Sequence, residues 1–121
     1  MTPWNDQQPI YRQVRDRLVA QILEGLLPEG APVPSVRQWA VEAQLNPLTV
    51  SRAYQELADA GVLEKRRGIG MFVAPGALEQ LRETERALFL TQHWPALRAR
   101  IERLGLSLPE LMAVPPEMPH D

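Results

Sequence analysis

The chain has 121 residues, of which 45% are hydrophobic, so it suits one small globular domain with an appendage rather than a disordered chain. Its formal net charge of −2 argues mildly against a nucleic-acid partner, and the absence of cysteine excludes a disulfide framework and thiolate metal sites. No apolar run approaches the roughly 18 residues of a membrane span, and the first residues lack the basic and apolar regions of a signal peptide. We therefore expect no membrane partner and a cytoplasmic location.

An amphipathic helix is predicted first. Apolar residues recur at every fourth position from Ile10 to Ile22, directly after Pro9, and charged residues lie on the opposite side. Glycine and proline within residues 25–30 end this helix. A second, short helix is predicted over residues 36–43, because Ser35 follows an extended proline-containing segment and serine is a preferred N-cap residue.

A third helix is predicted from Asn46-Pro47 to about Ala60, since asparagine caps a helix and proline suits its first turn. Its inner face is formed by Val50, Ala53, Tyr54 and Leu57. We expect its first turn to offer free backbone N–H groups to a phosphate. Two strands follow at residues 62–65 and 71–73, joined by the basic, glycine-containing connection Arg66-Arg67-Gly68-Ile69-Gly70.

The remaining residues are predicted to be helical, which divides the chain into a domain of residues 1–76 and a segment of residues 77–121. One helix runs from Ala77 to about His93. Pro95 is expected to break or kink it and to open a second helix that stops at Gly105. A last turn starts at Ser107, and the prolines at positions 115, 116 and 119 predict an extended, frayed tail.

Three helices followed by a β-hairpin form the winged helix-turn-helix plan, so the predicted fold is mainly α with a small β-hairpin, followed by a two-helix segment. In this plan the third helix enters the major groove. The tip of the hairpin, or wing, is expected to lie along the DNA backbone or in the minor groove. Taken singly, each basic or glycine residue is more simply a surface charge or a turn, but their joint order favours DNA. The predicted DNA-binding residues are Arg37, Asn46, Thr49, Ser51, Arg52, Arg66, Arg67, Gly68 and Gly70.

The chain resembles the GntR family of bacterial regulators over about residues 9–74. The matching motifs are Pro9-Ile10-Tyr11-Arg12-Gln13, Pro34-Ser35-Val36-Arg37, residues 46–57, Gly61-Val62-Leu63 and residues 66–73. The resemblance implies a winged helix that contacts an operator through Arg37, Thr49, Ser51 and Arg52, with Gly70 near the wing tip. Two positions depart from the family: Gln44 stands where glycine is usual, and Asn46-Pro47-Leu48 carries no arginine.

Only about 45 residues follow the wing. In this short segment the chain resembles the YtrA-type subgroup, and the resemblance implies a pair of helices used for dimerisation. A homodimer also follows from the residues, because two lone helices cannot bury their apolar surface, and it would match a two-fold symmetric double-stranded operator. The alternative is that the helices fold back on their own winged domain. The predicted dimerisation residues are Leu78, Leu81, Leu88, Phe89, Trp94, Leu97, Ile101 and Leu104.

The expected function is repression of a nearby operon, which the resemblance implies often encodes an ABC transporter; activation stays open. An enzyme is disfavoured because the sequence has no recognisable catalytic motif, and no metal or other cofactor is expected. A winged module that only binds proteins is disfavoured by the arginine-bearing third helix. A small-molecule effector is supported only by the aromatic residues Phe89 and Trp94, which are more simply core.

Overall fold

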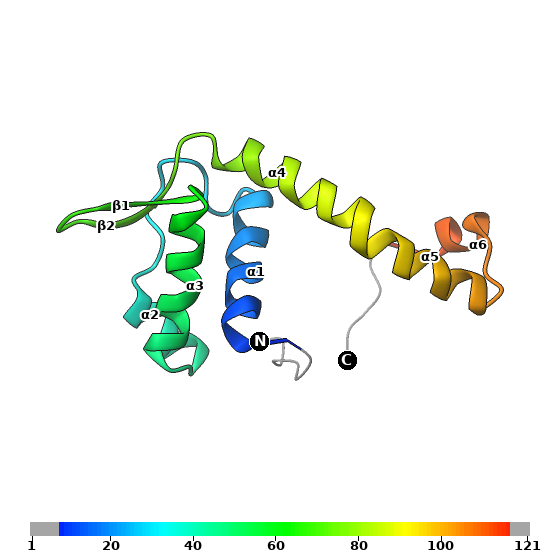
Figure 1. Ribbon diagram of the computed structural model, residues 1–121, viewed down its shortest axis with the longest axis horizontal. Coiled ribbons are helices and arrows are strands. Elements are labelled where there is room, and N and C mark those ends of the chain that lie inside the picture. Colours follow the sequence, from blue (N-terminus) through cyan, green and yellow to red (C-terminus); the bar gives the residue numbers. More distant parts are fainter. Residues whose placement is uncertain (1–7, 117–121) are drawn as a thin grey trace. The chain divides into compact units, whose positions relative to one another are not determined.

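The computed structural model describes residues 8–116 (Figure 1). The chain forms two compact units, which divide between Glu83 and Thr84. The first unit contains α1 (Ile10–Leu23), α2 (Val36–Ala43), α3 (Pro47–Asp59), β1 (Leu63–Arg66), β2 (Gly70–Val73) and the start of α4 (Ala77–Leu88). The second contains the end of α4, the π-helical turn η1 (Phe89–His93), α5 (Trp94–Arg103) and α6 (Leu108–Ala113). This mostly helical chain with a small hairpin confirms the predicted winged-helix fold.

The predicted helix starts are confirmed by their capping hydrogen bonds. The Ser35 hydroxyl accepts a hydrogen bond of 3.0 Å from the backbone N–H of Gln38 at the start of α2. The Asn46 side chain accepts one of 2.9 Å from the backbone N–H of Leu48 at the start of α3. Each cap supplies a partner to a backbone donor that the helix cannot satisfy itself.

The core of the first unit lies between α1 and α3, which run side by side in Figure 1. The inner residues of α3 are at most 1% exposed, as their spacing predicts, and they pack on the apolar side of α1. The Tyr54 hydroxyl crosses to the segment before α2 and donates a hydrogen bond of 2.6 Å to the Pro34 carbonyl. The buried residues of α1 and α3 are Gln13, Val14, Leu18, Val19, Ile22, Val50, Ala53, Tyr54 and Leu57.

The hairpin is antiparallel, with Leu63 opposite Val73 and Arg66 opposite Gly70. The segment before α2 forms backbone hydrogen bonds with β2, on the side away from β1. The backbone N–H of Val33 donates to the Met71 carbonyl and that of Val73 to the Ala31 carbonyl, both at 2.9 Å. This pairing fixes the base of the wing to the chain that leads into α2.

The first turns of α4 pack on the first unit. Ala77 and Leu81 are 0% and 2% exposed and belong to its core. The Gln80 side-chain amide donates a hydrogen bond of 2.6 Å to the Ala60 carbonyl, and the Glu29 carboxylate accepts one from the backbone N–H of Gly76. These contacts explain why the compact units divide at residue 83 rather than directly after the wing.

The helical course continues through Pro95, so the break that was one of the two expected outcomes does not occur. Pro95 lies in the first turn of α5, as predicted, and η1 joins α4 to α5 without a break. The backbone N–H of Trp94 bonds to the Phe89 carbonyl, five residues earlier, and the Thr91 hydroxyl donates to the Ala87 carbonyl at 2.8 Å. A π turn thus rearranges the hydrogen bonds ahead of a proline, which has no N–H of its own.

The second unit has no buried side chain within residues 84–116. Its last helix, α6, starts as predicted, with the Ser107 hydroxyl accepting a hydrogen bond of 3.3 Å from the backbone N–H of Glu110. Of the predicted tail, Pro119 lies outside the described residues. None of the described helices is both long and apolar enough to cross a membrane.

Candidate nucleic-acid interface

The exposed face of α3 carries the polar residues expected of a recognition helix. The buried residues of α3 share one side, and the positions opposite them recur at the helical spacing i, i+3, i+4 and i+7. We call this set the outer stripe, and all of its members are exposed: Leu48, Ser51, Arg52 and Gln55. Two of the predicted DNA-binding residues, Ser51 and Arg52, therefore point away from the core on the same turn of α3.

The start of α3 differs from expectation, because its backbone donors are already used. The Leu48 N–H is bound by the Asn46 side chain, and the N–H groups of Thr49 and Val50 reach the Asn46 carbonyl at 3.0 and 3.3 Å. Pro47 has no N–H. The prediction that the first turn of α3 offers free backbone N–H groups to a phosphate is therefore wrong. Contacts with a partner at this end of α3 are left to side chains. Asn46 is exposed, whereas Thr49 is half-buried beside the outer stripe.

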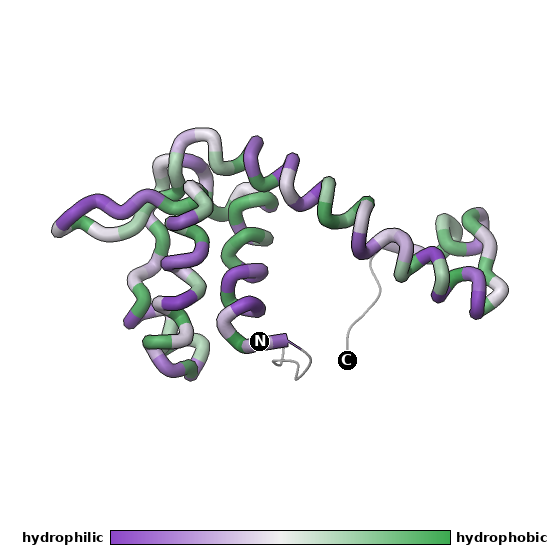
Figure 2. Tube along the Cα trace, viewed as in Figure 1, coloured by the Kyte–Doolittle hydropathy of each residue, from purple (hydrophilic) through white to green (hydrophobic). Residues whose placement is uncertain are grey.

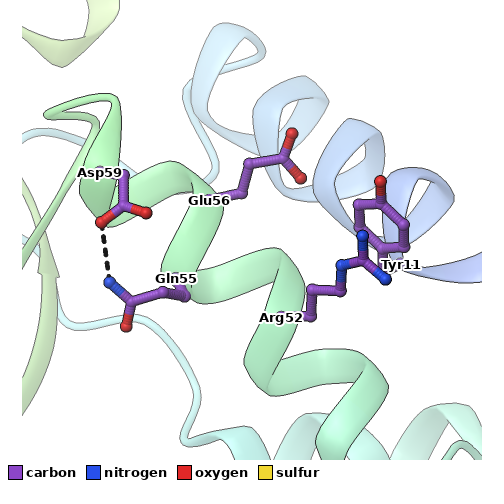
Figure 3. A pocket seen from close by; sticks show the side chains of 5 residues that line it. All are labelled: Tyr11, Arg52, Gln55, Glu56 and Asp59. Atoms are coloured by element: carbon purple, nitrogen blue, oxygen red, sulfur yellow. Dashed lines mark hydrogen bonds between the residues drawn. The ribbon is translucent and has the colours of Figure 1, made fainter.

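Arg52 is held by an aromatic ring of the first helix. Its guanidinium lies 3.8 Å from the ring centroid of Tyr11, and Figure 3 shows it over the ring. A guanidinium over an aromatic face is attracted electrostatically, by about 0.5–1 kcal/mol at an exposed site. The stacking restricts the side chain before it meets any partner. Sequence reasoning missed Tyr11, because it belongs to the apolar pattern of α1 and only packing brings it to Arg52.

A shallow depression of about 290 Å³ surrounds Arg52. In Figure 3 the Gln55 amide donates a hydrogen bond of 2.8 Å to the Asp59 carboxylate, one turn farther along α3. One oxygen of Glu56 is buried without a hydrogen-bond partner among the described residues. Glu56 also contributes to raising the pKa of Arg12, after the larger effect of Tyr11. The depression is lined by Tyr11, Arg52, Gln55, Glu56 and Asp59.

The two arginines of the wing differ in their contacts with the rest of the chain. Arg66 lies 4.1 Å from the ring centroid of Phe72 and 3.5 Å from the Glu64 carboxylate, so its guanidinium is partly occupied by the wing itself. Arg67, at the turn, has no ion pair or side-chain hydrogen bond within residues 8–116, and it is exposed. Figure 2 shows the hydrophilic character of β1.

The glycines of the wing tip allow its tight turn. Gly68 and Gly70 have φ angles of 76° and 136°, which side-chain-bearing residues rarely adopt. The Ile69 N–H closes the turn with a hydrogen bond of 2.9 Å to the Arg66 carbonyl. Apart from the glycine itself and its two chain neighbours, no atom of the described residues lies within 4 Å of the space a Cβ would occupy at either glycine, so both positions are open to an approaching partner.

The fold brings the start of α2 close to the wing. A cleft of about 340 Å³ separates them, with Val36 on one side and Gly70 on the other. Arg37 follows Val36 and is exposed, with no ion pair in the described part of the chain. The first unit thus presents Arg37, the outer stripe and the basic wing as three exposed elements.

The predicted dimerisation residues fall into two groups. Leu81 belongs to the core of the first unit and Leu78 packs against that core, so neither forms part of an exposed face. The remaining six lie in the second unit and in the end of α4, half-buried or exposed: Leu88, Phe89, Trp94, Leu97, Ile101 and Leu104. Phe89 lies 6.5 Å from the ring of His93, and within residues 84–116 no ring contact joins it to Trp94.

Comparison with known proteins shows which family shares this sequence. The model of the gntR family of bacterial regulatory proteins matches residues 10–73. The chain is 30% identical to the HTH-type transcriptional repressor YtrA of Bacillus subtilis (strain 168), over 113 residues covering 87% of this chain and 85% of YtrA. It is 36% identical to the HTH-type transcriptional regulator YhcF of the same strain over 74 residues, which is 61% of each chain and so less than two thirds of that relative.

A solved structure extends the similarity to most of the fold. A GntR family transcriptional regulator from Listeria monocytogenes superposes with a TM-score of 0.72 and 29% identity, covering 91% of this chain and 95% of that one. Three helices, a third helix with a polar outer stripe and a basic wing define a helix-turn-helix regulator of the DNA-binding class. The chain belongs to the GntR family, and over most of its length it is similar to a YtrA-type member. It belongs among transcriptional regulators and not among enzymes.

Proposed function

We propose that the protein is a homodimeric repressor that binds a two-fold symmetric operator near its own gene, in the cytoplasm. Each subunit places α3 in a major groove, where Ser51 and Arg52 contact base edges and Thr49 supports them. Arg37 and the wing residues Arg66 and Arg67 contact the backbone on either side. The regulated operon is proposed to encode a transporter of the ABC class.

The observation that carries this proposal is the position of Arg52. It is exposed in the middle of the outer stripe, and the Tyr11 ring holds its guanidinium in place. Arginine forms paired hydrogen bonds with the O6 and N7 atoms of guanine, the commonest base-specific contact in the major groove. A guanidinium that is already restricted loses less conformational entropy when it forms such a pair.

The homodimer is supported by the exposed apolar side chains of the second unit. Eight large hydrophobic side chains there are between 37% and 78% exposed, with no buried side chain beneath them in residues 84–116. A segment of this kind gains stability by burying its apolar surface against a second copy. The eight are Phe89, Leu90, Leu97, Leu104, Leu106, Leu108, Met112 and Val114.

The test is a fluorescence-anisotropy titration with the DNA immediately upstream of the gene, beside a scrambled duplex. Arg52→Ala should weaken binding to the native duplex by about 1–3 kcal/mol, which is roughly 5- to 150-fold, because it loses a base contact. Arg82→Ala is the matched control, since Arg82 is also exposed but lies on α4. Native binding should also weaken steeply as salt rises.

Equal binding of wild type and Arg52→Ala would remove Arg52 from the base-reading set. Equal and weak binding to both duplexes would refute an operator at this place. Transcription in vitro from the same DNA separates the regulatory outcomes: steric occlusion predicts less transcript as protein is added, and more transcript would replace repression by activation.

A further inference from the structure

We propose that Leu48 is a specificity-determining residue that reads the 5-methyl group of a thymine in each half-site. The inference rests on the proposed function, because it assumes that α3 lies in the major groove. It adds to that function an apolar contact, made by Leu48, and the base pair that this contact selects, A·T.

Leu48 has the position of a base-reading residue. It lies in the first turn of α3, at the N-terminal end of the outer stripe, with Ser51 and Arg52 on the next turn of the same face. Its side chain is 77% exposed, on the side of the helix opposite the buried face. When α3 enters the groove, the first turn and this face approach the base edges.

The exposure of Leu48 by itself does not indicate a functional role, because single exposed leucines are ordinary. The residues around it indicate what Leu48 can contact. Every other member of the outer stripe is polar, so Leu48 has no apolar neighbours there with which to form a protein-docking face. The N-terminal backbone donors of α3 are used by Asn46, so the side chains at this end are what meets the DNA.

The chemistry of leucine then limits what it can recognise. Its side chain has no hydrogen-bond donor or acceptor, so it cannot pair with the polar edge of any base. The thymine methyl is the apolar group that bases display in the major groove. Contact with it removes apolar surface of both partners from water. Leu48 therefore favours thymine at the position that it faces.

The experiment removes the methyl group from the DNA and not only from the protein. A duplex is first enriched from a random library by the wild-type protein. Each thymine is then replaced in turn, in both half-sites, by deoxyuridine, which lacks only the methyl. Replacement of the thymine that faces Leu48 should weaken wild-type binding about fourfold per half-site, as expected for one buried methyl group.

The variant Leu48→Ala should bind the thymine and deoxyuridine duplexes equally. Leu26→Ala is the matched control: Leu26 is also exposed, at 68%, but lies beyond α1, so this variant should keep the wild-type preference for thymine. Both variants replace exposed side chains, and their unfolding temperatures should stay close to that of the wild type.

The outcomes separate this inference from the proposed function. If a duplex is enriched and bound specifically but no thymine methyl affects affinity, the role of Leu48 is refuted while DNA recognition stands. The same holds if Leu48→Ala keeps the full preference for thymine over deoxyuridine. If the library yields no enriched sequence, both proposals are overturned.

Discussion

Tyr54 joins α3 to the chain segment that leads into α2. Its side chain is 1% exposed, and its hydroxyl donates a hydrogen bond of 2.6 Å to the Pro34 carbonyl. Replacement by phenylalanine leaves that carbonyl without its partner while keeping the ring. We expect Tyr54→Phe to lower the free energy of unfolding by about 1–2 kcal/mol, measured by urea denaturation at pH 7.

The same residue makes stability fall at alkaline pH. Burial raises the pKa of the Tyr54 phenol, with a smaller contribution from Glu42. In the unfolded chain a tyrosine ionises near pH ~10, whereas the folded chain keeps the Tyr54 proton there, so the unfolded state binds fewer protons. The free energy of unfolding should therefore decrease as pH rises above about 10.

Tyr54→Phe should lose this part of the alkaline decrease, and Tyr11→Phe should keep it. The measurement is urea denaturation of the three proteins between neutral and alkaline pH. An alkaline decrease that is identical in wild type and Tyr54→Phe would assign it to other groups.

The turn between α2 and α3 is made by a residue poorly suited to its backbone. Gln44 ends α2 in the left-handed conformation, with φ 58° and ψ 48°, where glycine is the usual residue. A side chain with a Cβ is strained there. The helix-turn-helix geometry is kept nevertheless, because the N–H groups of Gln44 and Leu45 bond to the Val41 and Ala40 carbonyls at 3.3 and 2.9 Å.

We expect Gln44→Gly to stabilise the protein, by up to about 1 kcal/mol, because the relief of strain exceeds the added freedom of the unfolded chain. Gly25→Ala is the control of opposite sign. Gly25 has φ 86° with nothing within 4 Å of an added Cβ, so only the backbone conformation opposes alanine there. Thermal unfolding should therefore give a higher midpoint for Gln44→Gly and a lower one for Gly25→Ala. A lower midpoint for Gln44→Gly would mean that its side chain makes a compensating contact.

At the scale of the whole molecule, the proposed homodimer makes operator binding depend on assembly. Trp94, Leu97 and Ile101 of α5 form one apolar stripe, which the C-cap residue Leu104 continues, at spacings of three and four residues. In the proposed dimer, Leu97→Glu would place a charge in the interface and should shift the protein toward monomer, since an unpaired buried charge is costly. Light scattering after size exclusion measures the mass against that of the 13.7 kDa chain.

Ala99→Glu supplies the matched control, because Ala99 is exposed on the opposite side of the same helix. It introduces the same charge and should leave the dimer intact. A monomeric wild-type protein, or equal masses for both variants, would contradict a dimer built on this stripe. Loss of operator affinity should accompany the loss of the dimer, because a monomer engages only one half-site.

The local features of this protein follow from the sequence alone. The starts of α2, α3 and α6 were predictable because capping depends on residues only two or three positions apart, as for Ser35, Asn46 and Ser107. The inner face of α3 was predictable because the period of the helix sets which residues share a side. The candidate base-reading residues Ser51 and Arg52 follow from the same periodicity.

The tertiary structure decided the features that join distant parts of the chain. Packing of α1 on α3 brings Tyr11 to Arg52, and packing of α4 on the first unit places Leu81 in its core. Pairing of Ala31 and Val33 with β2 fixes the base of the wing. No local propensity encodes these contacts, because each depends on how whole elements fill one core. The hydrogen-bond register near Pro95 was also decided only there: a π turn ahead of Pro95 keeps the chain helical, where proline alone predicts a break or a kink.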